Sequence, residues 1–262
     1  MYELIKYENM KRIVFGCALV FLGLSVFSQN KPDKTILFIP FDSKMYNNQE
    51  SAAMLPESEM TYEQSIQYFT TSLDEHMTMA IRDSINVYSL LRTYTTDAYN
   101  DIDIVHQQAD YVLTKRPENL EEKRNLSAVT SIKSRFKKEK EKPERLPNGE
   151  IVSVRDDNKD KFVSVKFLDP QVFIDLISNY SAQYVVFITQ FEIVGDYSNP
   201  YLVGSKQYPR IIRVHYVIFN KNATFITGDV IESVFTAQEN NISTICNTYF
   251  PKIAKLIAKQ LP

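Results

Sequence analysis

The sequence predicts a mixed α/β domain, in which three or four helices pack on a mixed sheet of about five strands. Three features of the chain lead to this prediction. Residues 35–41 form an apolar run that contains Pro40, and such a run is typical of a central strand buried on both faces. Residues 61–85 carry apolar side chains at helical spacing. Residues 183–235 carry apolar strand patterns separated by polar turns.

The first half of the chain continues from this strand through a polar stretch. Residues 42–60 show no period and are expected to form a loop. Thr61 is followed three residues later by Gln64, a capping-box pattern that places the start of the long helix there. A second strand is expected at 87–95. The segment 97–113 has apolar residues on one side of a helix, and we expect it to be helical.

A charged segment, residues 115–161, interrupts this order. It contains a short strand pattern at 151–154. From Lys133 to Arg145 there are seven basic and three acidic residues, a composition typical of a solvated helix or a disordered insertion. The alternative is a basic surface for phospholipid headgroups or another anionic partner. Residues 133–145 are therefore a candidate surface for peripheral membrane contact.

Regular structure resumes with a strand at 162–168. Asp169 and Pro170 then give the N-cap and first-turn proline that favour a helix start. Three strands follow, and the last two are joined by a short hairpin connection at 221–223; they are expected at 183–194, 210–220 and 224–235. Residues 195–200 are expected to form a loop. A C-terminal helix is expected at 242–261, with Pro251 as a kink or as its true start.

The N-terminus is typical of a secretory signal peptide. A basic start at 10–12 leads into an apolar run at 13–27 and then into polar residues. Fifteen residues at a rise of 1.5 Å cover about 22 Å, which is short of the hydrocarbon thickness of about 30 Å. We expect cleavage after Ser28, with Val26 and Ser28 in the small-residue positions, and the natural start at Met10. A retained N-terminal anchor is the alternative.

These features divide the chain into a leader and one interrupted domain. The expected parts are the signal peptide (1–28), the first part of the α/β domain (29–114), the charged insertion (115–161) and the second part of the same domain (162–262).

The composition is that of a packed globular protein that needs no disulfide. The formal net charge is −2, and loss of the leader, with three basic and two acidic residues, would change it to −3. A net charge close to zero gives no positive electrostatic field that would attract nucleic acid. Cys17 lies inside the leader, so Cys246 would be the single thiol of the mature chain. Its place in an apolar helix pattern predicts a small buried hydrophobe.

The sequence contains none of the common catalytic or cofactor motifs, such as GxSxG, GxGxxG, HExxH or CxxC. No cofactor, metal or catalytic residue is therefore predicted. His76 is expected at the rim of the long helix. His106 has Asp103 and Asp110 nearby, which would place three potential ligands on one helix face, although polar helices often show this spacing by chance. His215 alternates with apolar residues and could face solvent or an insertion.

Several segments in order resemble one family of periplasmic domains. The apolar strand that ends in Pro40-Phe41 is similar to the opening strand of domains related to the N-terminal domain of TolB and to the curli-secretion channel subunit. The long helix 61–85 follows at the place expected from that family. Residues 184–191 resemble the family's "Y-V-V" strand, and residues 214–228 resemble the hairpin that follows it. The resemblance implies an envelope protein that acts through protein–protein contacts and has no catalytic centre.

The chain also departs from the family pattern. Thr189-Gln190 stand where a glycine usually follows the strand, and Asn222 stands at a turn glycine. The lipid-modified cysteine of many members is absent, and residues 115–161 are extra. This segment is too charged to form a membrane-spanning hairpin of the channel subunit.

Three functions follow from these observations. The first is an exported scaffold or assembly factor, located in the periplasm or at the periphery of the outer membrane, which binds envelope proteins or associates with itself. The second is a module that binds a small ligand or a glycan through a tyrosine-rich surface and the loop at 195–209. The third is an exported hydrolase whose site carries no recognised motif.

Overall fold

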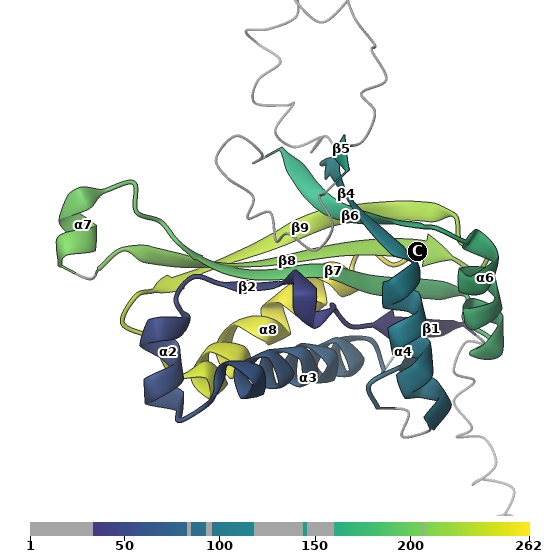
Figure 1. The fold of residues 1–262 in the computed structure, drawn as a ribbon, viewed down its shortest axis with the longest axis horizontal. Coiled ribbons are helices and arrows are strands. Elements are labelled where there is room, and N and C mark those ends of the chain that lie inside the picture. The colour runs from purple at the N-terminus through teal and green to yellow at the C-terminus, as the bar shows by residue number, and fades with distance from the viewer. Residues whose placement is uncertain (1–33, 83–84, 93–95, 118–143, 146–159, 206) are drawn as a thin grey trace, which may run out of the picture. The chain divides into compact units, whose positions relative to one another are not determined.

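In the computed structural model, the chain forms a mixed α/β fold, which confirms the predicted fold class (Figure 1). The structure describes residues 34–82, 85–92, 96–117, 144–145, 160–205 and 207–262. The predicted leader at 1–28, the strand pattern at 151–154 and most of the segment 115–161, including Lys133, lie outside the described residues. Within the described part, no helix has the length and apolar character needed to cross a membrane.

The main sheet is organised around β7 (Tyr184–Gly195). On one side, β7 pairs in parallel with β1 (Thr35–Ile39), and β1 pairs in parallel with β3 (Asn86–Ser89). β2 (Tyr46–Asn48) pairs in parallel with a later part of β7, beyond the residues that pair with β1. One long strand therefore holds two short strands from the first part of the described chain.

Two antiparallel strands complete the main sheet on the other side of β7. β8 (Pro209–Asn220) pairs with β7 along its length, and β9 (Phe225–Thr236) pairs with β8. Both strands and the short connection between them agree with the predicted hairpin. In the described part of the chain, β9 pairs with β8 alone and forms one edge of the sheet (Figure 1).

A second, three-stranded antiparallel sheet lies against the first. It contains β5 (Glu144–Arg145), β4 (Ala109–Lys115) and β6 (Lys161–Phe167), in that order. The ring of Phe162 packs over Gly228 of β9, where a Cβ atom would come within 2.6 Å of the ring. Glycine is therefore needed at this position for the close approach of the two sheets.

Helices cover both faces of the main sheet. On one face, α3 (Tyr62–Ile81) packs against α8 (Ile242–Ala258), with α2 (Ser51–Ser58) beside them. On the other face lie α4 (Thr96–Gln108), α6 (Pro170–Asn179) and the second sheet. β1 and β7 are buried on both faces, which explains why their sequences are continuous apolar runs.

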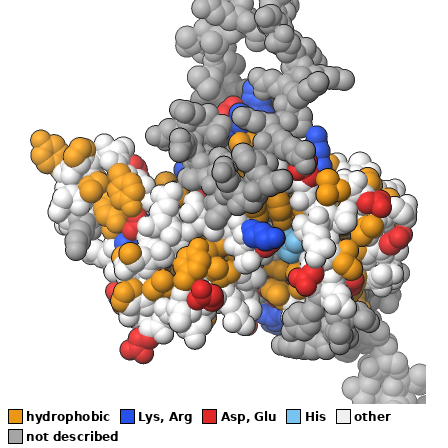
Figure 2. All heavy atoms as spheres, in the orientation of Figure 1, with side chains coloured by type: hydrophobic (Ala, Val, Ile, Leu, Met, Phe, Trp, Pro, Cys, Tyr) orange, Lys and Arg blue, Asp and Glu red, His pale blue; other side chains and the backbone are white. Residues whose placement is uncertain are grey.

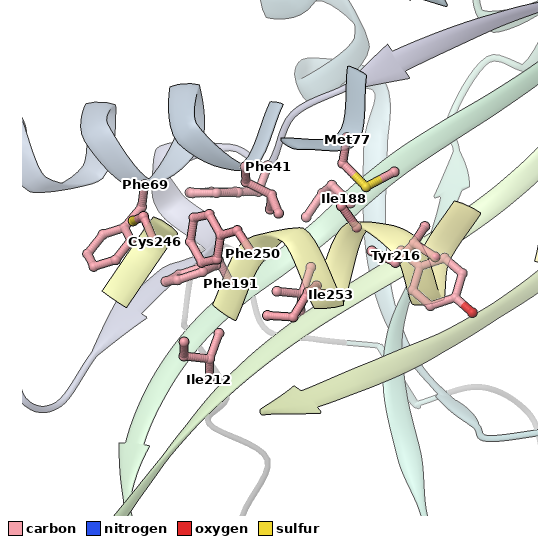
Figure 3. Packing of buried hydrophobic residues seen from close by; sticks show 14 of the residues in the cluster. Phe41, Phe69, Met77, Ile188, Phe191, Ile212, Tyr216, Cys246, Phe250 and Ile253 are labelled. Atoms are coloured by element: carbon pink, nitrogen blue, oxygen red, sulfur yellow. The ribbon is translucent and has the colours of Figure 1, made fainter. Parts of the chain in front are cut away.

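Aromatic side chains from distant segments form the centre of the helix-covered core (Figure 3). The Phe191 ring lies 5.1 Å from the ring of Phe69, 5.4 Å from that of Phe41 and 5.9 Å from that of Phe250, measured between centroids. Cys246 lies in the same cluster with no exposed surface, and burial raises the pKa of its thiol to about 12. The predicted role of Cys246 as a buried hydrophobe is confirmed.

Local signals place the helix starts as predicted. Thr61 and Gln64 form a capping box at the start of α3, with both side-chain-to-backbone hydrogen bonds present. Asp169 caps α6, and Pro170 is the first residue of that helix. Pro251 lies inside α8, nine residues after its start at Ile242, so the prediction that it marks the helix start is wrong.

Three further predictions need correction. The expected loop at 42–60 contains the 3-10 turn η2 (Ser43–Met45), β2 and α2. The expected helix 97–113 stops at Gln108, because the residues that follow pair with β6 as strand β4. The expected strand 87–95 is shorter, since β3 ends at Ser89. For β2 and β4, partner strands distant in the sequence decide the local structure, and the local pattern does not contain them.

Candidate functional site

The most distinctive exposed feature is the connection between β7 and β8, residues 196–208, which we call the tyrosine arm. It extends from one end of the sheet and carries the short helix α7 (Pro200–Gly204) (Figure 1). At its base, the Asp196 amide donates a hydrogen bond of 2.8 Å to the Pro209 carbonyl. The strands therefore remain paired up to the point where the arm begins.

Short-range hydrogen bonds give the arm a defined conformation. The Asp196 carboxylate accepts from the Ser198 amide at 3.0 Å. Asn199 caps α7 by accepting from the Tyr201 amide at 3.0 Å, and Pro200 follows as the first helical residue. The Gln207 amide then donates to the Leu202 carbonyl at 2.8 Å and closes the turn. The predicted loop thus contains a capped helical turn.

A buried ion pair lies at the root of the arm. Arg210, the second residue of β8, places its Nε 2.8 Å from Oε2 of Glu50, and the two side chains are 2% and 3% exposed. The Nε–H does not point at the oxygen closely enough for a hydrogen bond, so this contact is electrostatic. Arg210 Nη1 also donates to the Asn240 side chain at 2.7 Å and to the Glu239 carbonyl at 3.2 Å. The pair therefore connects the start of α2, the start of β8 and the segment before α8.

Two tyrosines of the arm complete the coordination of this buried carboxylate. The Tyr208 hydroxyl donates to Glu50 Oε2 at 2.8 Å, and the Tyr197 hydroxyl donates to Glu50 Oε1. The two rings lie 5.0 Å apart between centroids, and the Arg210 guanidinium lies 5.7 Å from the Tyr208 ring. Burial, together with the hydrogen bond to Glu50 and its charge, raises the pKa of Tyr197. Tyr197 is therefore held as a neutral donor.

Gly195 allows the chain to pass this cluster. A Cβ atom at this position would lie 2.5 Å from the Tyr197 ring and 2.6 Å from Glu50 Oε1. Both distances are shorter than carbon atoms tolerate, so a side chain here would displace the tyrosine or the carboxylate. Gly204, at the end of α7, has nothing within 4 Å of the same position. Of these two glycines, only the one at the root is required by packing.

The tip of the arm presents apolar surface. Tyr201 is 89% exposed, and the residues that follow it in α7, Leu202 and Val203, are half-buried. The space-filling view shows hydrophobic side chains gathered at this end of the molecule (Figure 2). Tyrosines that combine an exposed ring with a firmly held backbone are typical of protein–protein contact sites, because little conformational freedom is lost on binding.

Comparisons with protein-family models, curated proteins and solved structures gave no match. The resemblance to the TolB-related domains therefore stays a prediction.

A second polar cluster lies inside the protein, on the face of the main sheet opposite α3. Glu192 of β7 and His215 of β8 have no exposed surface, and His215 Nε2 lies 3.8 Å from Glu192 Oε2. His215 Nδ1 accepts a 3.0 Å hydrogen bond from the Val163 amide of β6. Glu192 Oε1 accepts from the side chains of Asn47 and Gln190. These contacts join the two sheets.

This position of His215 overturns one prediction. We expected its side chain to face solvent or an insertion, but the second sheet covers it completely. Because Nδ1 accepts a hydrogen bond, Nε2 is the ring nitrogen that carries a proton, and it faces Glu192. A histidine and a glutamate that are both fully enclosed act here as structural links between strands.

His106 also differs from its predicted surroundings. Its Nδ1 lies 3.1 Å from the Tyr111 hydroxyl, and Asp110 belongs to β4 because α4 has already ended. The three-ligand helix face formed with Asp103 is therefore wrong. Within the described ranges, no group of three or more His, Cys, Asp or Glu side chains could share a metal ion. His76 lies half-buried on α3 at the rim of the core, as predicted, with its ring edge-on to Phe250.

A third buried carboxylate belongs to α3. Asp74 is 1% exposed, accepts from the Ser89 hydroxyl and lies 2.6 Å from Arg92 Nε. Burial raises the pKa of Asp74, and the contacts with Ser89 and Arg92 act in the opposite direction. The cluster ties the end of β3 to α3. It is therefore part of the scaffold.

Sequence analysis pointed to the loop at 195–209 but missed its buried root. Glu50 lies in a stretch predicted as a loop, and Arg210 lies at the start of a strand about 160 residues later. No local pattern relates the two. The available signal was the arginine itself, because a charged residue at an otherwise apolar strand start requires a partner.

Proposed function

We propose that this chain is an exported cell-envelope protein that acts as a non-enzymatic scaffold or assembly factor through protein–protein contacts. The tyrosine arm is its docking element. The predicted leader supports export, and the absence of catalytic motifs in the sequence supports a binding role. The observation that carries the proposal is the contrast between an exposed aromatic tip and a root held by a buried ion pair.

The expected partner is an envelope protein that offers an apolar pocket to Tyr201. An aromatic ring that enters such a pocket contributes more to the binding free energy than the residues around it. A few buried aromatic residues carry most of the affinity of an interface. The hydroxyls of Tyr197 and Tyr208 already donate to Glu50, so these rings are fixed in place. Tyr201 is 89% exposed, so its side chain can be buried by a partner.

In the test, a photo-activatable phenylalanine analogue replaces Tyr201 in cells that produce the full chain. We expect one discrete cross-linked product in the envelope fraction. In a second arm, Tyr201→Ser should weaken capture of that same product at least tenfold. Removal of a central interface tyrosine typically costs about 2 kcal/mol or more. The matched control is Tyr88→Ser on β3, which removes another exposed tyrosine and should leave capture unchanged.

The outcomes separate the proposal from its alternatives. If Tyr201→Ser and Tyr88→Ser weakened capture of the partner equally, docking through the arm would be contradicted. The absence of any cross-linked product would contradict it as well. Stabilisation of the purified protein by a sugar or small ligand, abolished by Tyr201→Ser, would favour the ligand-binding module.

A further inference from the structure

In the part of the chain that the structure describes, the second half of β9 forms an edge of the main sheet with the properties of a self-pairing surface. The direction of the backbone groups follows from printed hydrogen bonds. The Ala237 amide donates to the Tyr208 carbonyl across the β8–β9 pair. The Pro209 carbonyl accepts from Asp196, on the β7 side. Because directions alternate along a strand, the even-numbered residues of β9 direct their amide and carbonyl groups away from β8.

Val230 confirms this alternation and marks one limit of the open edge. Its amide donates to the Asp229 carboxylate at 2.8 Å, and its carbonyl accepts from Arg116 Nη2 at 3.3 Å. Arg116 also forms an ion pair of 2.6 Å with Asp229. Both outward groups of Val230 are therefore satisfied within the chain, and the guanidinium blocks a strand from pairing there.

The other limit lies at the end of β9. The Thr236 carbonyl accepts from the Glu239 amide at 3.1 Å, where the chain turns toward α8. Between the two limits, the outward-directed backbone groups are those of Glu232 and Val234 and the amide of Thr236. No strand of the described part of the chain pairs with this side. The open segment is thus centred on Val234.

The side chains of this segment favour a copy of itself over another strand. Val234 is 61% exposed, a large fraction for a branched apolar residue in a strand. In an antiparallel pair with a two-fold axis at Val234, this residue meets Val234 of the partner subunit. Glu232 then lies opposite the partner's Thr236, so no two carboxylates face each other. β9 also contains no lysine and no proline, and Glu232, the charged residue of this segment, is paired with Arg213 at 2.9 Å within the same sheet.

We propose that two copies of this protein associate through antiparallel pairing of residues 232–236 of β9, which joins their main sheets. The Arg116–Asp229 pair limits the contact to this short segment and thereby fixes its register. This surface is separate from the tip of the tyrosine arm, so self-pairing goes beyond the docking function proposed above.

Cysteine cross-linking of the full chain, with Cys17 replaced by serine and the buried Cys246 kept, tests the register. Directly opposed residues lie about 5.5 Å apart between Cα atoms, within the range for a disulfide. Val234→Cys should therefore form a covalent dimer with itself under mild oxidation. Glu232→Cys and Thr236→Cys alone should each form no disulfide-linked dimer, because two identical positions lie roughly 14 Å apart at 3.4 Å per residue. Their mixture should form a heterodimer.

Sedimentation of uncross-linked variants provides the second measurement. Val234→Lys should raise the dimer dissociation constant at least tenfold, because it places two ammonium groups face to face. Val234→Thr keeps the β-branched shape and should change the dimer dissociation constant less than threefold. Tyr201→Ser should leave dimerisation unchanged, which separates this surface from the arm. A monomer at all concentrations, or self-cross-linking of position 232 or 236 alone, would overturn the proposal, and so would protection of the edge by a segment of the same chain.

Discussion

Glu50 and Arg210 are almost completely removed from water, so each depends on the other for compensation of its charge. The surrounding donors strengthen this dependence, since Tyr197 and Tyr208 both donate to the carboxylate. An ion pair of this kind contributes little net stability over a well-packed apolar pair. Removal of one partner, however, strongly lowers the free energy of unfolding, because the other charge is left buried and unpaired. Its role is therefore to define where the arm leaves the sheet.

Glu50→Gln should lower the free energy of unfolding by about 3 kcal/mol, because the amide keeps the shape but leaves the Arg210 charge buried without a counter-charge. Urea denaturation monitored by circular dichroism provides the measurement. Asp175→Asn, at an exposed position of α6, should shift stability by less than about 0.5 kcal/mol. The double variant Glu50→Gln/Arg210→Met should recover part of the loss. A loss of less than about 1 kcal/mol in Glu50→Gln would mean that the pair is not the anchor of the arm.

Residues differ in how much of their role can be predicted from the sequence. Thr61 and Asp169 act on amides two or three positions away, so their capping roles were predictable. The partners of Glu50 and His215 lie in other segments, Arg210 and Tyr208 for the first and Val163 for the second. Composition and periodicity carry no information about such pairs.

At the level of elements, the arm depends on the glycine at its root. Gly195→Ala should lower stability by about 1–3 kcal/mol, because the new methyl group collides with Tyr197 and Glu50. We also expect faster amide exchange across residues 196–208, since the displaced tyrosine no longer holds the arm.

The matched control is Gly204→Ala, whose Cβ meets nothing within 4 Å. Its free energy of unfolding should lie within about 0.5 kcal/mol of that of the unchanged protein. Chemical denaturation and hydrogen exchange read by mass spectrometry measure both variants. Equal effects of the two substitutions would show that the root is not tightly packed.

The elements that the sequence predicted well are those whose own residues contain the signal. α3, α6, β7 and the β8–β9 hairpin have caps, turns or long apolar runs of their own. β2 and β4 were missed for a different reason. β2 is a strand because it pairs with β7, and β4 is a strand because it pairs with β6. β4 also continues directly from the helix α4. Local preference is overridden there by pairing across the fold.

At the level of the whole molecule, the expected place of action is outside the cytoplasm. The predicted leader should be removed after Ser28, so that the mature chain starts at Gln29. Mass spectrometry of the protein purified from an envelope extract measures this start. Replacement of Val26 and Ser28 by arginine should block cleavage and leave the longer form. A full-length product in the cytosolic fraction of unmodified cells, still bearing its leader, would contradict export.

The position of β1 and β2 along β7 has a further consequence for how the polypeptide acquires its structure. Ile36 pairs with Tyr184, a separation of about 150 residues, so the centre of the sheet forms only by closing long loops. Contacts of such range make folding slow, and the early strands have no acceptor until the last third has been synthesised. Under the proposed export, a nascent chain with this order of strands would remain open for threading through a secretion channel. The same pairing makes closure of the central sheet a late step, because β1 and β2 can pair only once β7 is present.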